Sequence, residues 1–144
     1  MKVLLDTSVL VAAMVESHPA HERSLSWLQR IKKGSDTGLV SAHTIAELYA
    51  ILTTLPMKPR ISPTVAYGLI KHNVFELCEV LPLTSEDYNV LIKHLSEGGV
   101  TGGVTYDAVI LYVAIKENAD CVVTLNEADF RRIYPEIAEQ IVSP

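Results

Sequence analysis

The chain has few cysteines, no long apolar run and no excess of positive charge, and each shortage excludes a class of protein. Its two cysteines, Cys78 and Cys121, do not stand in a CxxC or CxxH pair. This excludes a zinc knuckle and a dense disulfide framework, so we expect both cysteines to be small buried apolar residues. No uninterrupted apolar stretch approaches the roughly 18 residues that indicate a membrane-spanning helix.

The charge and the opening segment limit partners and location. With 17 acidic and 12 basic residues, the net charge is -5, which argues against binding nucleic acid mainly by broad electrostatic attraction. A nuclease whose bound cations change the local charge is still allowed. The first apolar run is broken by Asp6, Thr7 and Ser8, where a secretory signal would stay apolar. We therefore expect a cytoplasmic protein with no membrane association.

What is present is enough for one domain with a sizeable core. The chain has 144 residues, of which 49% are apolar and 20% are charged. These proportions exclude a disordered, collagen-like or coiled-coil protein, and the length is that of one ordinary domain. We expect a single domain over residues 1–144.

Short apolar runs alternate with longer helical patterns along the chain. They predict strands at 2–5, 37–40, 77–83, 121–125 and 140–142, and helices at 7–15, 19–33, 42–55, 63–75, 84–97, 104–118 and within 126–134. Such alternation is typical of a parallel sheet covered by helices, so we expect an α/β fold, a three-layer α/β/α sandwich with a central, mostly parallel sheet. Ligands of such folds bind at the carboxyl ends of the strands.

Two acids stand at unusual places in the first half of the chain. Asp6 closes the first strand, although for a single Asp the simplest role there is a helix cap. Glu47 lies in a helix that is apolar on most sides, with His43 one turn before it. An unpaired carboxylate there would cost several kcal/mol, so Glu47 must be ion-paired, protonated, near the rim or bound to a cation.

A third acid and a polar cluster lie in the second half. Asp107 begins a helix segment that is apolar all round; its simplest role is favourable charge at a helix N-terminus, and Thr105 could cap the same turn. Thr124 ends the fourth strand and is followed by Asn126 and Asp129. For these the simplest interpretation is a polar turn in which Asn126 caps a short helix.

Convergence favours a functional interpretation of these acids. Two of the polar clusters end parallel strands, and two lie on helices that must pack against the same sheet. Carboxylates gathered in this way repel one another unless a positive charge lies among them. Oxygen ligands without cysteine or a histidine triad are what Mg²⁺ or Mn²⁺ prefers, so a divalent metal site is expected.

The chain resembles a PIN domain, specifically the VapC type of toxin ribonuclease, over essentially its whole length. The resemblance rests on four segments in order: VLLDTSVLVAA with Asp6, IAELYA with Glu47, YDAVILYVAIKENADCVVT with Asp107, and VVTLNEADF. The last segment departs from the pattern, because Asn126 occupies a place where many relatives carry Asp. This lowers the charge of the site, which Asp129 could restore.

The resemblance implies a metal-dependent endoribonuclease that hydrolyses RNA phosphodiester bonds and leaves a 5′-phosphate and a 3′-hydroxyl. It implies Mg²⁺ or Mn²⁺ as cofactor, a small antitoxin protein as partner, a homodimer, and a role as the toxin of a type II toxin-antitoxin pair. The implied metal ligands and catalytic residues are Asp6, Glu47, Asp107 and Asn126. The residues expected to contact and orient these ligands without binding the metal themselves are Thr7, Ser8, Thr124 and Asp129.

Several other polar residues have weaker claims. His18 and His21 are spaced for a shared zinc ion but lack an evident third ligand, so the simpler interpretation is that both are polar residues at the surface. The helices near 43–55 and 63–75 could present an apolar surface to a second copy or to an antitoxin. Four basic residues could hold phosphates beside the acids, or could simply aid solubility: Lys58, Arg60, Arg131 and Arg132.

Three alternatives stay open or are set aside. A PIN nuclease that processes RNA without being a toxin is one, and a degenerate binding module that keeps the fold but not catalysis is another, because of Asn126. A phosphotransfer enzyme would need Asp-x-Asp after the first strand, where Asp6 is followed by Thr7 and Ser8. A receiver domain would need a lysine ending the last strand, which VVTLN does not offer.

Overall fold

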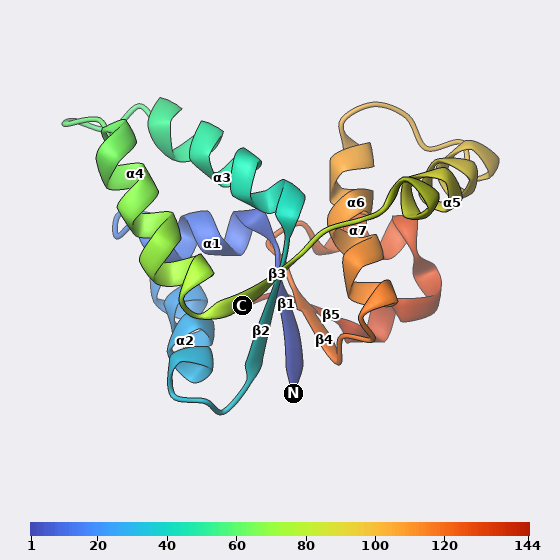
Figure 1. Ribbon diagram of the computed structural model, residues 1–144, viewed down its shortest axis with the longest axis horizontal. Coiled ribbons are helices and arrows are strands. Elements are labelled where there is room, and N and C mark those ends of the chain that lie inside the picture. The colour runs from blue at the N-terminus through green and yellow to red at the C-terminus, as the bar shows by residue number, and fades with distance from the viewer.

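A five-stranded parallel sheet forms the centre of the protein, and helices cover both of its faces (Figure 1). The computed structural model describes residues 1–144. The strand order is β3-β2-β1-β4-β5, and every neighbouring pair is parallel. The strands are β1 (Lys2–Leu5), β2 (Thr37–Ser41), β3 (Cys78–Leu81), β4 (Cys121–Val123) and β5 (Ile141–Val142). The expected three-layer α/β/α fold is confirmed.

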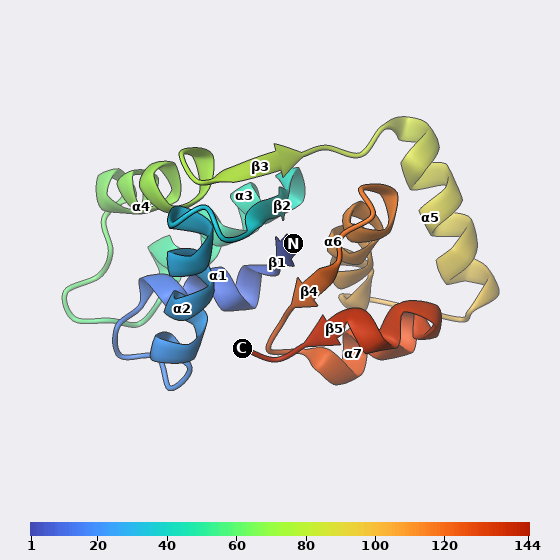
Figure 2. The same cartoon turned by 90° about the horizontal axis from the view of Figure 1, so that it is seen from below.

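The helices divide into two groups, one on each face of the sheet (Figures 1 and 2). One group consists of α1 (Thr7–Met14), α2 (His21–Lys32), α3 (Ala42–Thr54), α4 (Pro63–Ile70) and the π-helical turn η1 (Lys71–Phe75). The other consists of α5 (Ser85–Glu97), α6 (Val104–Lys116), α7 (Glu127–Ile133) and the 3₁₀ helix η2 (Pro135–Gln140).

The central strand β1 contributes to two separate cores. Val3 and Leu5 pack with the helices of the first group, whereas Leu4 packs with those of the second. All three side chains are completely buried. This follows from the alternation of side chains along a strand, combined with a parallel sheet that is covered on both faces. No helix is both long and apolar enough to span a lipid bilayer.

Two predicted helix starts, those of α3 and α5, are confirmed by their caps. The Ser41 hydroxyl accepts a hydrogen bond from the His43 amide at the start of α3. Thr84 and Asp87 form a reciprocal capping box at the start of α5. These pairings satisfy amide groups that have no partner inside the helix, which is why such residues mark helix starts in a sequence.

Other boundaries differ from the sequence prediction. Helix α2 begins at His21 rather than Pro19, because His18 accepts a hydrogen bond from the Ala20 amide and forms a turn there. Gly103, not Thr105, stands at the cap position of α6. The predicted helix at 63–75 is α-helical only to residue 70 and then widens into η1. Strand β3 is shorter than predicted, and η2 was not predicted at all.

One glycine is required by close packing between α2 and the sheet. A Cβ atom at Gly38 in β2 would lie 2.7 Å from Cys78 Sγ and 2.8 Å from Ile31 Cδ1. Both cysteines are free; Cys121 is buried and Cys78 is half-buried. Burial raises the pKa of the Cys78 thiol to about 11. Both therefore behave as small apolar residues, as expected.

Candidate active site

Asp6 is held at the carboxyl edge of the sheet by its own backbone. Its amide donates to the Val123 carbonyl at 3.0 Å, which continues the pairing of β1 with β4 by one residue. The chain then turns directly into α1, and Asp6 occupies the cap position without a capping side-chain hydrogen bond. The side chain of Asp6 therefore does not cap α1, which was the simplest role expected for it. Asp6 is 2% exposed.

The Asp6 carboxylate instead accepts hydrogen bonds from two hydroxyl groups. Ser8 Oγ donates to Asp6 Oδ2 at 2.6 Å, and Thr124 Oγ1 donates to the same oxygen at 2.8 Å. Each hydroxyl also accepts from a backbone amide of the β4–α7 turn, that of Leu125 or Asn126. Burial raises the pKa of Asp6, although the hydrogen bonds from Ser8 and Thr124 act to lower it.

Thr7 differs from the expectation that it supports the carboxylate. Its hydroxyl donates to the hydroxyl of Thr44 at 3.2 Å, and both residues are buried. The side chain of Thr7 thus ties α1 to α3. Thr7 contributes to the site by fixing the helix that carries Glu47, and Ser8 and Thr124 are the two hydroxyl donors to Asp6.

Glu47 lies at the rim of the site and is paired with His43. Nε2 of His43 lies 3.2 Å from Oε2 of Glu47, one helical turn apart on α3, and both side chains are partly exposed. The imidazole ring of His43 also stacks on the phenol ring of Tyr106, with centroids 5.3 Å apart and planes 4° from parallel. This pairing of His43 with Glu47 was anticipated from their spacing, whereas the contact with Tyr106 was not.

The surroundings of Asp107 show that the acids lie near one another. Asp107 lies in the first turn of α6 and is half-buried. Burial raises the pKa of Asp107 most, the negative charges of Asp6, Glu47 and Asp129 raise it in the same direction, and together they bring it to about 6. The four carboxylates come from the end of β1 and from three helices. We call Asp6, Glu47, Asp107 and Asp129 the acidic cluster.

The two candidates for the fourth ligand have different surroundings. Asp129 lies within α7 and forms an ion pair with Arg132 at 3.1 Å. Asn126 is exposed at the cap position of α7, but its side chain makes no capping hydrogen bond. The simple interpretation of Asn126 as a helix cap is therefore not supported. Its amide side chain is not used by the fold.

The donor set suits a hard cation, although the side chains are not arranged around one. Asp6, Glu47 and Asp107 have no lysine or arginine within ion-pair distance. Carboxylate oxygens without a basic partner are what Mg²⁺ and Mn²⁺ prefer. As they stand, no three His, Cys, Asp or Glu side chains form a group that could hold a metal ion. Mutual repulsion favours such a spread arrangement, and metal binding would draw the carboxylates closer together.

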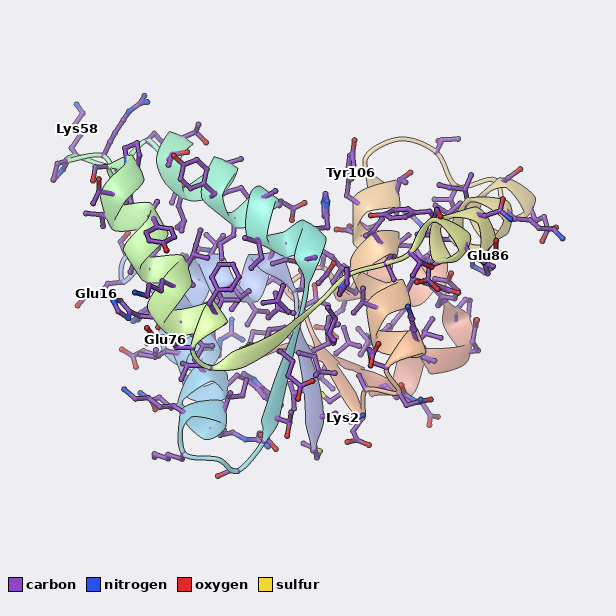
Figure 3. The ribbon with its side chains drawn as sticks, viewed as in Figure 1. Lys2, Glu16, Lys58, Glu76, Glu86 and Tyr106 are labelled. Atoms are coloured by element: carbon purple, nitrogen blue, oxygen red, sulfur yellow. The ribbon has the colours of Figure 1, made fainter.

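The basic residues suggested as phosphate contacts are mostly remote or already paired. Lys58 and Arg60 lie in the loop beyond the end of α3, and Figure 3 shows Lys58 at the opposite end of that helix from Tyr106. Arg131 is paired with Glu127 at 2.9 Å and donates to the Ile141 carbonyl, so it joins α7 to β5. Arg132 adjoins the acidic cluster through its ion pair with Asp129, and Arg131 lines a pocket together with Asn126 and Asp129.

The two histidines before α2 do not form a shared metal site. Nδ1 of His18 accepts from the amide of Ala20 at 3.0 Å. Nδ1 of His21 lies 2.9 Å from the carbonyl oxygen of Ala12. Each ring is therefore oriented by a different part of the backbone, consistent with a structural role.

Comparison with known proteins identifies the family of the chain. The family model described as the PIN domain matches residues 3–135 of the chain. The chain belongs to the PIN domain family. Ribonuclease VapC40 of Mycobacterium tuberculosis is 37% identical over 109 residues, which cover 76% of this chain and 75% of that protein. Ribonuclease VapC27 of the same species is 28% identical and covers 96% of this chain and 93% of its own length.

Solved structures of two VapBC assemblies share the fold. A chain from VapBC2 of Rickettsia felis, bound to a DNA fragment from its promoter, superposes with a TM-score of 0.68, covers all of this chain and is 22% identical. A chain from DNA-bound VapBC of Salmonella typhimurium superposes with a TM-score of 0.70 over 99% of this chain, at 21% identity. The matched lengths are 99% and 98% of those two chains.

Proposed function

We propose that this PIN domain is a metal-dependent endoribonuclease and the toxin of a type II toxin-antitoxin pair. The observation that carries the proposal is the convergence of Asp6, Glu47 and Asp107 at the carboxyl edge of the sheet, none of them paired with a lysine or arginine. Their mutual repulsion, together with burial, raises the pKa of Asp107 to about 6. A positive ion bound there would offset the repulsion between the carboxylates.

Relatives support the choice of substrate and partner. Two curated relatives are named as ribonucleases, and neighbours of known structure are VapBC assemblies. We infer an RNA substrate, a small antitoxin protein as inhibitor, a homodimer and a cytoplasmic location. An antitoxin that covers the acidic cluster would keep the nuclease inactive until it is removed.

The residues at the site have different proposed roles. In this proposal Asp6, Glu47 and Asp107 hold Mg²⁺ or Mn²⁺, and the free amide of Asn126 completes the set. The bound ion would activate water at neutral pH and neutralise phosphate oxygens. Ser8 and Thr124 fix the orientation of the Asp6 carboxylate. His43 orients Glu47, which can accept a proton from the attacking water.

Cleavage of a mixed RNA pool tests this proposal. The purified protein is incubated with Mg²⁺, Mn²⁺ or EDTA, and the new ends are mapped by sequencing. We expect internal cuts that leave 5′-phosphates with either ion, none with EDTA, and none with Asp107→Asn. Glu86→Gln, which removes an exposed carboxylate from α5, is the matched control and should cut normally. Cutting that persists in EDTA would overturn the metal-dependent scheme.

Two alternatives give different results in related experiments. A degenerate binding module, suggested by Asn126 in place of Asp, would bind RNA without cutting it under any of these conditions. A PIN nuclease that processes cellular RNA would cut, but its expression without a neighbouring small protein would not arrest growth. Growth arrest that is relieved by co-expressing such a neighbour supports the toxin assignment.

A further inference from the structure

Tyr106 is an exposed aromatic ring placed directly beside the acidic cluster. It is 55% exposed and immediately precedes Asp107 in the first turn of α6. Figure 3 shows it at the top of α6, across from the beginning of α3. Nothing in the core requires a phenol ring there, because Tyr106 is not among the residues packed in or against the core on that face of the sheet.

The ring of Tyr106 is nevertheless held in place. It stacks on His43 of α3 with parallel planes, and His43 is itself fixed by its contact with Glu47. An aromatic side chain on a surface normally exchanges freely between rotamers. Here the orientation is set in advance by a chain of contacts that ends on one of the acids of the cluster, so a flat ligand would find the ring already positioned.

The charge distribution leaves a role for such a ring. RNA-binding surfaces commonly rely on lysine and arginine for affinity, and on aromatic rings that stack on unpaired bases. This chain has a net charge of -5, and the basic residues considered for phosphate contacts are paired or remote, as described above. Non-electrostatic contacts must then supply a larger share of the affinity for RNA.

We propose that His43 and Tyr106 form a platform on which one unpaired base of the RNA stacks, next to the phosphate that enters the acidic cluster. This deepens the proposed function, on which it rests, by assigning a single-stranded substrate and a positioning residue. Because Tyr106 stacks on His43, which lies 3.2 Å from Glu47, a base on the platform would lie beside a phosphate bound at the acidic cluster. Base-paired RNA cannot present a free face to the platform.

The test compares RNA with and without bases. Binding is measured by fluorescence anisotropy in Mg²⁺ buffer with the Asp107→Asn variant, in which cleavage is silenced. The ligands are a labelled oligouridine and a labelled abasic oligomer with the same number of phosphates. Tyr106→Leu should weaken oligouridine binding by about tenfold or more, since stacking on an aromatic side chain contributes roughly 1 to 3 kcal/mol per base. The abasic oligomer should bind both proteins equally.

Two further variants distinguish stacking from general effects. Tyr106→Phe keeps the flat ring and should retain oligouridine affinity within about threefold, because stacking needs the ring rather than the hydroxyl. Tyr67→Leu, which removes a tyrosine of similar exposure (60%) from α4, should leave both affinities unchanged. The platform is refuted if Tyr106→Leu weakens the two ligands equally, or if it weakens neither.

The outcome separates this inference from the proposed function. If the otherwise unaltered protein cleaves RNA but Tyr106→Leu has no base-dependent effect on binding, the proposed nuclease activity is retained and the platform is refuted. Base-dependent binding through Tyr106 without cleavage would retain the platform and make the protein an RNA-binding module.

Discussion

The buried aspartates at the two edges of the sheet have opposite charged neighbours. At the amino edge, Asp36 is 8% exposed and is paired with both the Met1 ammonium at 3.2 Å and Arg30 at 2.7 Å. At the carboxyl edge, Asp6 is 2% exposed and accepts hydrogen bonds from two hydroxyl groups, while its charged neighbours are other acids. The amino edge is thus neutralised within the chain, and the carboxyl edge is not.

This difference separates residues that stabilise the fold from residues that are kept for function. Removing one partner from a buried ion pair leaves an uncompensated charge and destabilises a protein. Removing one of several repelling carboxylates does the reverse, because the raised pKa values show that their charged forms are disfavoured in the folded state. Substitutions at the two edges should therefore have opposite effects on stability and on activity.

The largest effect is expected for Asp107→Asn. Loss of a metal-binding carboxylate should lower the rate of RNA cleavage by at least about a hundredfold, which corresponds to several kcal/mol of transition-state stabilisation. The same change should raise the unfolding free energy of the metal-free protein at neutral pH by about 1 kcal/mol, after discounting for the half-exposed position of the residue. Urea denaturation and a cleavage assay measure the two effects. A variant that loses both activity and stability would contradict the comparison.

The opposite pattern is expected for Asp36→Asn. This change leaves the Arg30 guanidinium and the Met1 ammonium without their shared partner, and should lower the unfolding free energy by roughly 2 to 3 kcal/mol, less than for a fully buried pair because both cations are partly exposed. The cleavage rate per folded molecule should change little, since the residue lies at the far edge of the sheet. Thermal unfolding and single-turnover cleavage at a permissive temperature measure this. Unaltered stability would show that the amino-edge pairs contribute nothing.

A smaller effect is expected when a hydroxyl behind Asp6 is removed. Thr124→Val keeps the shape of the side chain but deletes the donor to Asp6 and the acceptor for the Asn126 amide. Cleavage should fall by about tenfold, with Mn²⁺ binding weakened in parallel, because residues that orient a metal ligand typically contribute this much. Thr54→Val, at the exposed end of α3, is the matched control. If Thr124→Val and the control are equally active, Thr124 does not contribute to the site.

The smallest effect concerns pH. The folded-state pKa of Asp107 is raised to about 6, so between the unfolded-state pKa and that value the native state binds more protons than the unfolded state. The contribution of Asp107 to stability therefore falls as pH rises from about 4 to 6 and is constant above that range. With solvent screening, we expect a difference of about 1 kcal/mol between metal-free protein and Asp107→Asn that develops over this interval. A pH-independent difference would mean that the charge of Asp107 is not the cause.

Local sequence signals predicted much of the fold. Ser41, Thr84 and Asp87 cap helices because their side chains bond amides only two or three residues away, and such contacts depend little on the rest of the protein. The alternation of strands and helices indicated the parallel sheet for a similar reason. The π-helical turn after Ile70 and the start of α2 beyond Pro19 depend on packing and on a local turn, respectively, and the sequence pattern did not reveal them.

The candidate site was predicted less evenly. The sequence indicated that Asp6 and Asp107 would share one edge of the sheet, because strand ends and helix starts in an α/β fold converge there. The direction of a side chain between two elements was not predictable. Thr7 faces Thr44 instead of the carboxylate, Arg131 is used to hold β5, and Tyr106 meets a histidine from another helix. The available signal for Tyr106 was an aromatic residue directly before a helix-starting acid.

Direct observation of a bound ion is the sharpest test of a metal site formed by Asp6, Glu47 and Asp107. Crystals of the protein soaked in Mn²⁺ should show an anomalous difference peak at the carboxyl edge of the sheet. We expect oxygens of Asp6 and Asp107 at about 2.0 to 2.6 Å from the peak, with Glu47 bound directly or through water. Manganese found only elsewhere, or a saturating soak that leaves this edge without a peak, would contradict the account.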